Sequence, residues 1–285
     1  EKAPAEASRV LGTGERGAGD KQFTGPLGAV WVPSQRDWII TTESGGHRVK
    51  VSNVRTGAMV CKFGSYGRAE GQFGYPVGVT ITSNSSLVLV ADMFNNRVQV
   101  LRLVVAADGQ SARLEFVRSI TGNGEGRAEG QLCHPIGIAL HKDAGGQQTV
   151  LVIDSNHRVS QFALDTGAFI RTFAGSRTGE AGSGNGFFSF PSGIAVLGDS
   201  SGEVAIADCS NHRVQIFDRE GNYLRQFGTE YPTLLASDAH GNILVTDQRT
   251  SRLQVFNSKG KHLCTRSDLG LHLHSTKGLA WGKDG

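Results

Sequence analysis

One short phrase recurs five times along the chain, and this repetition constrains the fold more than any other feature. Each copy has an apolar run ending in an acid, a tight turn, and a second apolar run beginning with arginine. A unit of about forty to sixty residues built from short strands is typical of a β-propeller blade. The turn and second run read GHRVKV at 46–51, NNRVQVL at 95–101, SNHRVSQF at 155–162, SNHRVQIF at 210–217 and SRLQVF at 251–256.

Four of the copies follow a Pro-x-Gly start, as in PVGVTI and PSGIAV, and most are followed by a phrase such as RQFG. We therefore expect four strands in each blade, named a to d from the start of the unit to its end. The whole chain, 1–285, is predicted to form a single propeller domain because no blade can bury its faces alone. The expected blades span 26–73, 74–132, 133–188, 189–230 and 231–276.

The two ends of the chain suggest part of a further blade. SRVLGTG at 8–14 matches the strand-d phrases, and KGLAW at 277–281 matches strand a. A blade completed from both termini would leave no unpaired strand edge. We therefore predict an all-β, six-bladed propeller of four-stranded antiparallel blades. Its sixth blade is either truncated or completed from 1–25, the outer strand, and 277–285, the first strand.

Composition narrows the class of protein. The formal charge is only +3, with acids and bases interspersed, which argues against a strong polyanion-binding surface. No apolar run approaches the roughly 20 residues of a membrane span, and no signal peptide is visible. The four cysteines lack regular spacing, which favours free thiols in a reducing compartment. We expect a cytoplasmic, monomeric propeller. Because the chain begins at Glu1 rather than methionine, we also expect a fragment of a longer protein or a processed product.

The phrase SNHRVQIF, preceded by Asp208 and by PSGIA, resembles an NHL repeat. The resemblance covers five full copies and one split or truncated copy. It implies a propeller of the kind that binds proteins or RNA in tripartite-motif ubiquitin ligases and their relatives. Similar propellers also serve in a peptide-amidating lyase and in bacterial sensor domains. The motif is informative about fold and much less so about function, because function depends on sites that differ between members of a fold.

Two rows of charged residues recur in every copy. The acids could hold a cation, and the arginines could bind phosphate. Because each acid occurs together with an arginine, we interpret both rows as structural, with the acids accepting backbone N–H groups in turns. The acids are Glu43, Asp92, Asp154, Asp208 and Asp247, and the arginines are Arg48, Arg97, Arg158, Arg213 and Arg252.

Candidate catalytic groups are scarce. His272 and His274 alternate as on a strand, but zinc needs three or four ligands and no third is placed by spacing. The amidating lyase has metal-binding histidines directly after the strand-a prolines. This chain has other residues there, so the resemblance does not imply an active site. Nucleophilic catalysis lacks a motif as well. We predict no cofactor. The residues after the strand-a prolines are Leu27, Val77, Ile136, Ser192, Thr233 and, by alignment, Lys277.

The Gly-rich connections between strands d and a vary most between copies. In a propeller these d–a loops emerge on the same face as the b–c turns, and we call it the loop face. Binding residues are expected there because loops carry the differences that recognition requires. An aromatic such as Phe94 has little reason to lie in a solvated turn, although packing on the next loop would explain it too. The candidate binding residues are Arg16, Lys21, Tyr66, Arg68, Phe94, Arg127, Arg177 and Arg249.

These features favour a non-enzymatic interaction scaffold that binds a protein or peptide partner. Sequence-selective binding of single-stranded RNA on the same face is the first alternative, since Arg68 beside Tyr66 could combine a cation with a stacking ring. A propeller enzyme of the lyase or hydrolase type is the second alternative. We expect no membrane partner.

The scarcity of metal ligands gives a direct test. Protein purified without added metal is expected to contain no stoichiometric metal by elemental analysis. One equivalent of zinc held through His272 and His274 would contradict this prediction.

Overall fold

The computed structural model describes residues 17, 19, 21–143, 145–198, 201–247 and 249–266, and these form twenty strands in five sheets. The first three sheets contain β1 Pro26–Trp31, β2 Trp38–Glu43, β3 Arg48–Asn53 and β4 Met59–Phe63; β5 Pro76–Ile81, β6 Leu87–Asp92, β7 Arg97–Val105 and β8 Ala112–Ile120; and β9 Gly137–Lys142, β10 Gln148–Asp154, β11 Arg158–Ala163 and β12 Phe169–Gly175. The last two contain β13 Pro191–Val196, β14 Val204–Asp208, β15 Arg213–Phe217 and β16 Tyr223–Gly228; and β17 Pro232–Ser237, β18 Ile243–Asp247, β19 Arg252–Phe256 and β20 His262–Arg266.

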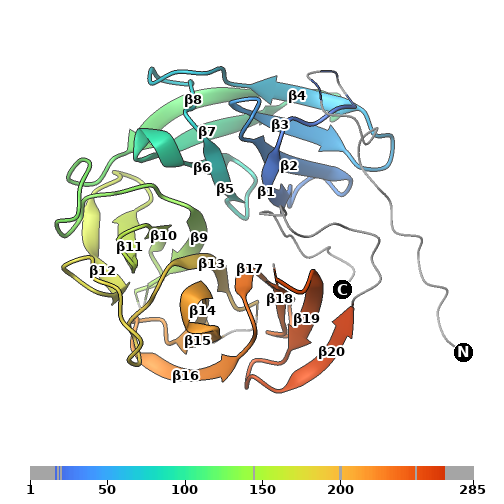
Figure 1. The fold of residues 1–285 in the computed structure, drawn as a ribbon. Helices are drawn as coiled ribbons and strands as arrows, with labels where there is room; N and C mark the ends of the chain where they lie inside the picture. Colours follow the sequence, from blue (N-terminus) through green and yellow to red (C-terminus); the bar gives the residue numbers. More distant parts are fainter. Residues whose placement is uncertain are drawn as a thin grey trace, which may run out of the picture.

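Each sheet is a propeller blade with four antiparallel strands in sequence order. Strands β1, β5, β9, β13 and β17 lie toward the centre, and each fourth strand lies at the periphery (Figure 1). The prediction of six blades is wrong: the described part of the chain forms five. Outside the five copies, only the segments 8–14 and 277–281 resemble strands, whereas a blade needs four. Both segments lie outside the described residues.

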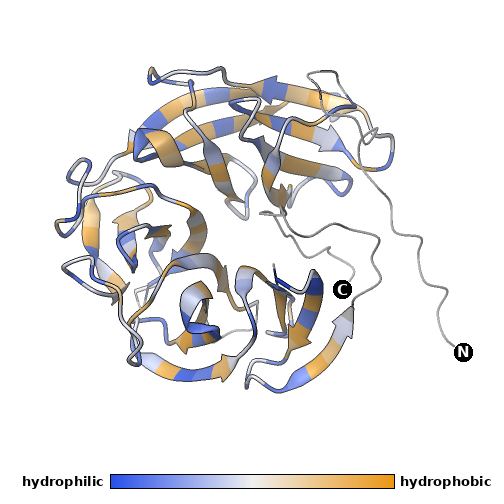
Figure 2. Ribbon diagram, viewed as in Figure 1, coloured by the Kyte–Doolittle hydropathy of each residue, from blue (hydrophilic) through white to orange (hydrophobic). Residues whose placement is uncertain are grey.

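Burial explains the different patterns of the strands. The middle strands are covered on both faces by neighbouring blades, so β6 and β14 are buried almost throughout and consist of consecutive apolar residues. The outermost strand β16 alternates between half-buried and exposed positions, which is the period expected of a strand with one solvated face. Figure 2 shows the same change from apolar inner segments to mixed outer ones.

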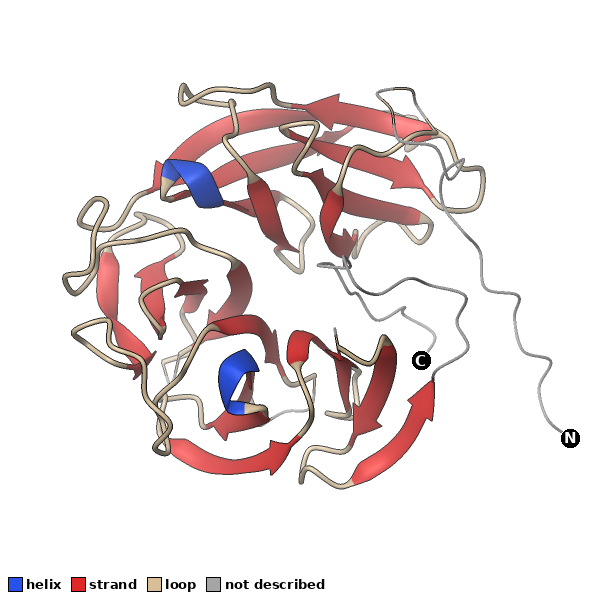
Figure 3. Ribbon diagram, in the orientation of Figure 1, coloured by secondary structure: helices blue, strands red, loops and turns tan. Residues whose placement is uncertain are grey.

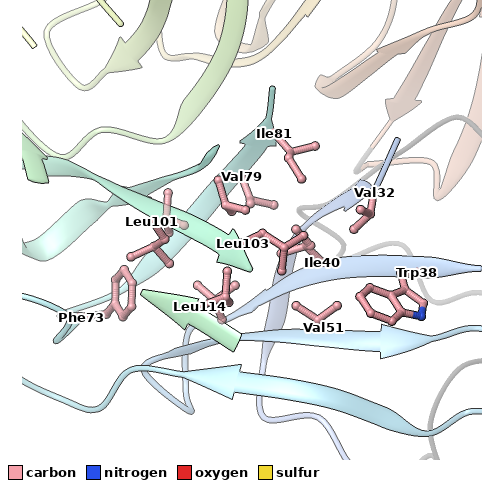
Figure 4. Close-up of a cluster of buried hydrophobic side chains, with 13 residues drawn as sticks. Val32, Trp38, Ile40, Val51, Phe73, Val79, Ile81, Leu101, Leu103 and Leu114 are labelled. Atoms are coloured by element: carbon pink, nitrogen blue, oxygen red, sulfur yellow. The ribbon is translucent and has the colours of Figure 1, made fainter. Parts of the chain in front are cut away.

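The hydrophobic core consists of four clusters, and each lies between two neighbouring blades of the described ring. Figure 4 shows the cluster between the first two blades, where Ile40 and Val51 face Val79 and Leu103. Phe73, from the loop joining these blades, is fully buried in the same cluster. Leu132 and Phe188 are equally buried at the next two junctions. The d–a loops therefore insert one apolar side chain into three of the four clusters.

The glycine of the Pro-x-Gly start is required by the close approach of the inner strands. A Cβ atom on Gly137 would lie 2.5 Å from the backbone oxygen of Ser192 in the next blade, and one on Gly193 would lie 2.5 Å from that of Thr233. Gly28 and Gly78 meet the next blade's backbone oxygens in the same way. In β17, the last described inner strand, the equivalent residue is Leu234.

The b–c turns contain two single 3₁₀ turns, η1 Met93–Asn95 and η2 Cys209–Asn211, drawn in blue in Figure 3. Each ends in a left-handed residue whose N–H closes the turn. The longer connection predicted at 106–112 in the second blade joins β7 and β8, which have nine residues each. Within the described ranges, no helix is long and apolar enough to cross a membrane.

Substitution Gly137→Ala should lower the free energy of unfolding by about 1–3 kcal/mol, because the new methyl group overlaps backbone atoms that cannot move independently. Chemical denaturation measures the effect. Gly228→Ala is the matched control, since an added Cβ there has no atom within 4 Å, and we expect a change within about 0.5 kcal/mol. Equal effects of the two substitutions would contradict this account of the repeated glycine.

Candidate functional site

The loop face is held by the buried acids that end the second strand of each blade. Asp92 accepts hydrogen bonds from the N–H groups of Gly74 (2.8 Å) and Tyr75 (3.1 Å), the segment that leads into the same blade's inner strand. Asp208 accepts one from Ser189 in the same way (2.8 Å). All five acids are fully buried. Such carboxylates are tolerated only because donors surround them.

Arginines that open the third strands connect these acids to the d–a loops. Arg97 Nε donates to Asp92 Oδ2 (3.1 Å), while its two other nitrogens donate to the carbonyl oxygens of Arg68, Ala69 and Gln72. Arg213 contacts Asp208 (2.7 Å) and the carbonyl oxygens of Gly184 and Phe187. The planar guanidinium thus joins a buried carboxylate to a glycine-rich loop.

Asparagines in the b–c turns make a second connection between the acids and the loops. The Nδ2 groups of Asn95, Asn156 and Asn211 each donate to their blade's acid. Each also donates to a glycine carbonyl of the preceding d–a loop, namely that of Gly67, Gly126 or Gly182, at 2.8 Å. The recurring Asn in the repeated phrase therefore fixes loop position.

Two blades depart from the acid–arginine pairing. Arg158 Nε lies 3.9 Å from Asp154, and the guanidinium instead donates to carbonyl oxygens on both flanking loops. Burial raises the pKa of Asp154 to about 6, which its hydrogen bonds and Arg158 offset only in part. In the fifth blade Arg252 is exposed, and within the described structure no ion pair joins it to Asp247.

An aromatic residue precedes the inner-strand proline in four of the five described blades, and sequence reasoning missed this row. The residues are Tyr75, His134, Phe190 and Tyr231, with Gly25 in the first blade. Phe190 is 62% exposed and stands edge-on to His157, with ring centres 4.8 Å apart. The aromatic-Pro pairs were visible in the sequence, but only comparison of all five copies would have shown them as one row.

Phe94 and Arg68, two of the predicted binding residues, lie together at a hollow of about 340 Å³ around the b–c turn of the second blade. Phe94 is 52% exposed and contacts the rings of Tyr75 and His134. The other lining residues are Asn95, Asn96, Arg97, Glu125 and His134. The hollow therefore combines an aromatic surface with positively and negatively charged side chains. Arg127, another candidate binding residue, is not part of its lining.

The remaining predicted binding residues are dispersed. Tyr66 is 73% exposed and packs edge-on against His47. Arg177 lies 3.8 Å from Glu129, which partly neutralises it. Lys21, Arg127 and Arg249 are exposed, and Arg16 lies outside the described residues.

No group of three or more His, Cys, Asp or Glu residues is placed to hold a metal ion in the described ranges, and His272 and His274 lie outside them. All four cysteines are free, as the sequence predicted. Burial raises the pKa of both Cys61 and Cys209 to about 11, so these two thiols stay protonated and weakly nucleophilic near neutral pH.

Comparison with known proteins gives related repeats. Residues 188–217 match the profile of the NHL repeat. Protein brain tumor from Drosophila melanogaster is 30% identical over 170 residues, or 59% of this chain and 14% of that protein. B-box type zinc finger protein ncl-1 from Caenorhabditis elegans is 31% identical over 167 residues, or 59% and 17%. These matches support the NHL-repeat family without giving a repeat count, and the chain spans less than a fifth of either relative.

Among solved structures, the crystal structure of the nidogen/laminin complex aligns with a TM-score of 0.64 at 16% identity. The alignment covers 91% of this chain and 86% of that one. At this level of identity the likeness establishes the propeller fold alone.

Arg213→Ala should lower the free energy of unfolding by more than about 1 kcal/mol, because it leaves the buried Asp208 without its cation. Thermal or chemical denaturation checks this. Arg252→Ala removes the equivalent but exposed side chain and is expected to change stability by less than about 0.5 kcal/mol. If Arg213→Ala unfolds like the wild type yet loses a ligand, the arginine row has a binding role instead.

Proposed function

We propose that this chain is a non-enzymatic interaction scaffold whose loop face binds a protein or peptide partner. The observation that carries the proposal is the half-exposed Phe94 beside Arg68 at the hollow. Aromatic residues and arginine are enriched at protein interfaces, and the few residues that carry most of the binding energy cluster in well-packed pockets. Their neighbours Asn95 and Arg97 are fixed by the buried Asp92, so this part of the site is already formed before a partner arrives.

The charges of the hollow suggest the chemistry of the partner. Arg68 suits a carboxylate, while Phe94 suits an apolar or aromatic side chain. Glu125 on the opposite loop adds a negative group that a uniformly acidic ligand would meet unfavourably. These features favour a peptide that presents an apolar residue next to a single acid.

Single-stranded RNA is the second candidate. Its support is the strongly exposed Tyr66 close in sequence to Arg68, together with the aromatic row before the prolines. Bases stack on such rings, and arginine contributes contacts to phosphate. Glu125 at the hollow and Glu129 next to Arg177 weaken this candidate, because they repel a polyanion.

The double substitution Phe94→Ala with Arg68→Glu should reduce binding at least about tenfold, or about 1.4 kcal/mol. Peptides selected from a random displayed library on the wild-type chain, and RNA from a random pool, serve as probes. Salt titration then separates the classes, since phosphate contacts give a steep dependence.

A matched control carries Arg113→Glu with Leu224→Ala, which makes the same change of charge and removes an exposed apolar side chain on outer strands. Circular dichroism confirms folding of both variants. The proposal is contradicted if the folded loop-face variant still binds every ligand while the control variant loses binding. That result would place the binding site away from the loop face.

A further inference from the structure

The peptide unit just before each aromatic-Pro pair faces the b–c turn of the preceding blade, and we call it the junction peptide. At 74–75 its carbonyl faces the turn, and His47 Nδ1 lies 2.9 Å from Gly74 O. At 230–231 the carbonyl faces the turn as well, where His212 Nδ1 contacts Glu230 O. A carbonyl oxygen can only accept, so both histidines carry a proton on Nδ1.

The other two aromatic junctions show the opposite orientation. The N–H of His134 donates to Asn96 Oδ1 (2.8 Å), and the N–H of Phe190 donates to His157 Nδ1 (3.1 Å). His134 and Phe190 both have φ of 50°, whereas Tyr75 and Tyr231 are not among the residues with positive φ. A left-handed residue before proline is strained, so the turn residue must hold the peptide in this orientation.

An alternative partner for the Phe190 N–H lies nearby. In the carbonyl-facing junctions, the N–H of the residue before proline donates to the buried acid, as Tyr75 does to Asp92 (3.1 Å) and Tyr231 to Asp247 (3.2 Å). Asp208 is the equivalent acid for Phe190, and at present it accepts from Ser189. Both orientations of this peptide are therefore accommodated by the same blade architecture.

The tautomer of His157 selects between them. Because an N–H group can only donate, Nδ1 of His157 is unprotonated while it accepts from Phe190. A proton on Nδ1 of His157 would place a second donor opposite the N–H of Phe190, and the hydrogen bond between them would be lost. We propose that His157 is a pH-sensitive switch: its protonation turns the 189–190 peptide to the orientation seen at 74–75 and 230–231, and moves the exposed ring of Phe190.

Charged groups around His157 influence the pH at which the switch operates. Arg127, on the loop before the third blade, disfavours the imidazolium, while Asp208 of the fourth blade favours it. On its own blade Asp154 and Arg158 are both buried and face each other. Burial, with Arg127, lowers the pKa of His157 below its ordinary value. The rotation of the peptide is thus expected at a pH below the ordinary histidine pKa of about 6.5.

If the proposed function is right, the switch regulates the loop face. Phe190 is exposed there and rests edge-on against His157, so its displacement changes the aromatic surface offered to a partner. Acidification would then weaken or alter binding that involves Phe190. The conformational change itself requires no partner.

Nuclear magnetic resonance of the isotopically labelled chain tests the switch between about pH 8 and about pH 5, the range of histidine titration. The amide and Cα shifts of Phe190 should move from left-handed to extended values, in one step that shares its midpoint with the His157 ring. In His157→Asn, which copies the acceptor at Asn96, Phe190 should stay left-handed at every pH. His212→Asn is the control and should leave the Phe190 transition unchanged.

Two results would overturn the proposal. One is a Phe190 that keeps its shifts while His157 titrates. The other is the same Phe190 transition in His157→Asn. Because no ligand is present, these results are independent of whether the loop face binds a protein.

Discussion

The structure depends on a buried carboxylate at the end of the second strand of every described blade. In isolation such a group would be strongly destabilising. In the second and fourth blades it is tolerated because backbone N–H groups, an asparagine amide and an arginine converge on it. For Asp208 the partners are Ser189, Asn211 and Arg213, with Gln215 as a fourth. They come from the d–a loop, the b–c turn and β15. The acid therefore fixes the third strand, the b–c turn and the d–a loop with respect to one another.

This arrangement explains how glycine-rich loops can form a defined surface. The loops contain few apolar side chains of their own, but arginine and asparagine from the strands and turns hold their carbonyl oxygens. Each of the loops that end in Phe73, Leu132 and Phe188 also inserts that residue into the core between two blades. Because strand and turn side chains hold the loop backbone, the exposed loop residues can differ between blades. Phe94, Tyr66 and Phe190 occupy such positions, and we propose that recognition takes place there.

Much of the fold could be predicted from the sequence, because the acid-turn-arginine phrase contains the interactions that hold each blade. The number of blades could not, since SRVLGTG at 8–14 and KGLAW at 277–281 match strand phrases without the partner strands that a sheet requires. The site was predicted only in part. Phe94 and Arg68 both line the hollow, whereas Arg127 does not and Glu125 does, because the path of a glycine-rich loop follows no periodicity. In our proposal, the orientation of the 189–190 peptide depends on the protonation of one nitrogen of His157, which no sequence pattern encodes.

Hydrogen–deuterium exchange of Arg213→Lys tests the central claim that the arginine row positions the loops. Lysine can still pair with Asp208, but it lacks the planar fork that reaches Gly184 and Phe187 at the same time. We predict faster exchange of the Gly182 and Phe187 amides, which close this loop, with β14 and β15 remaining protected. Unchanged exchange in the loop, or an equal loss of protection in the strands and the loop, would contradict the account.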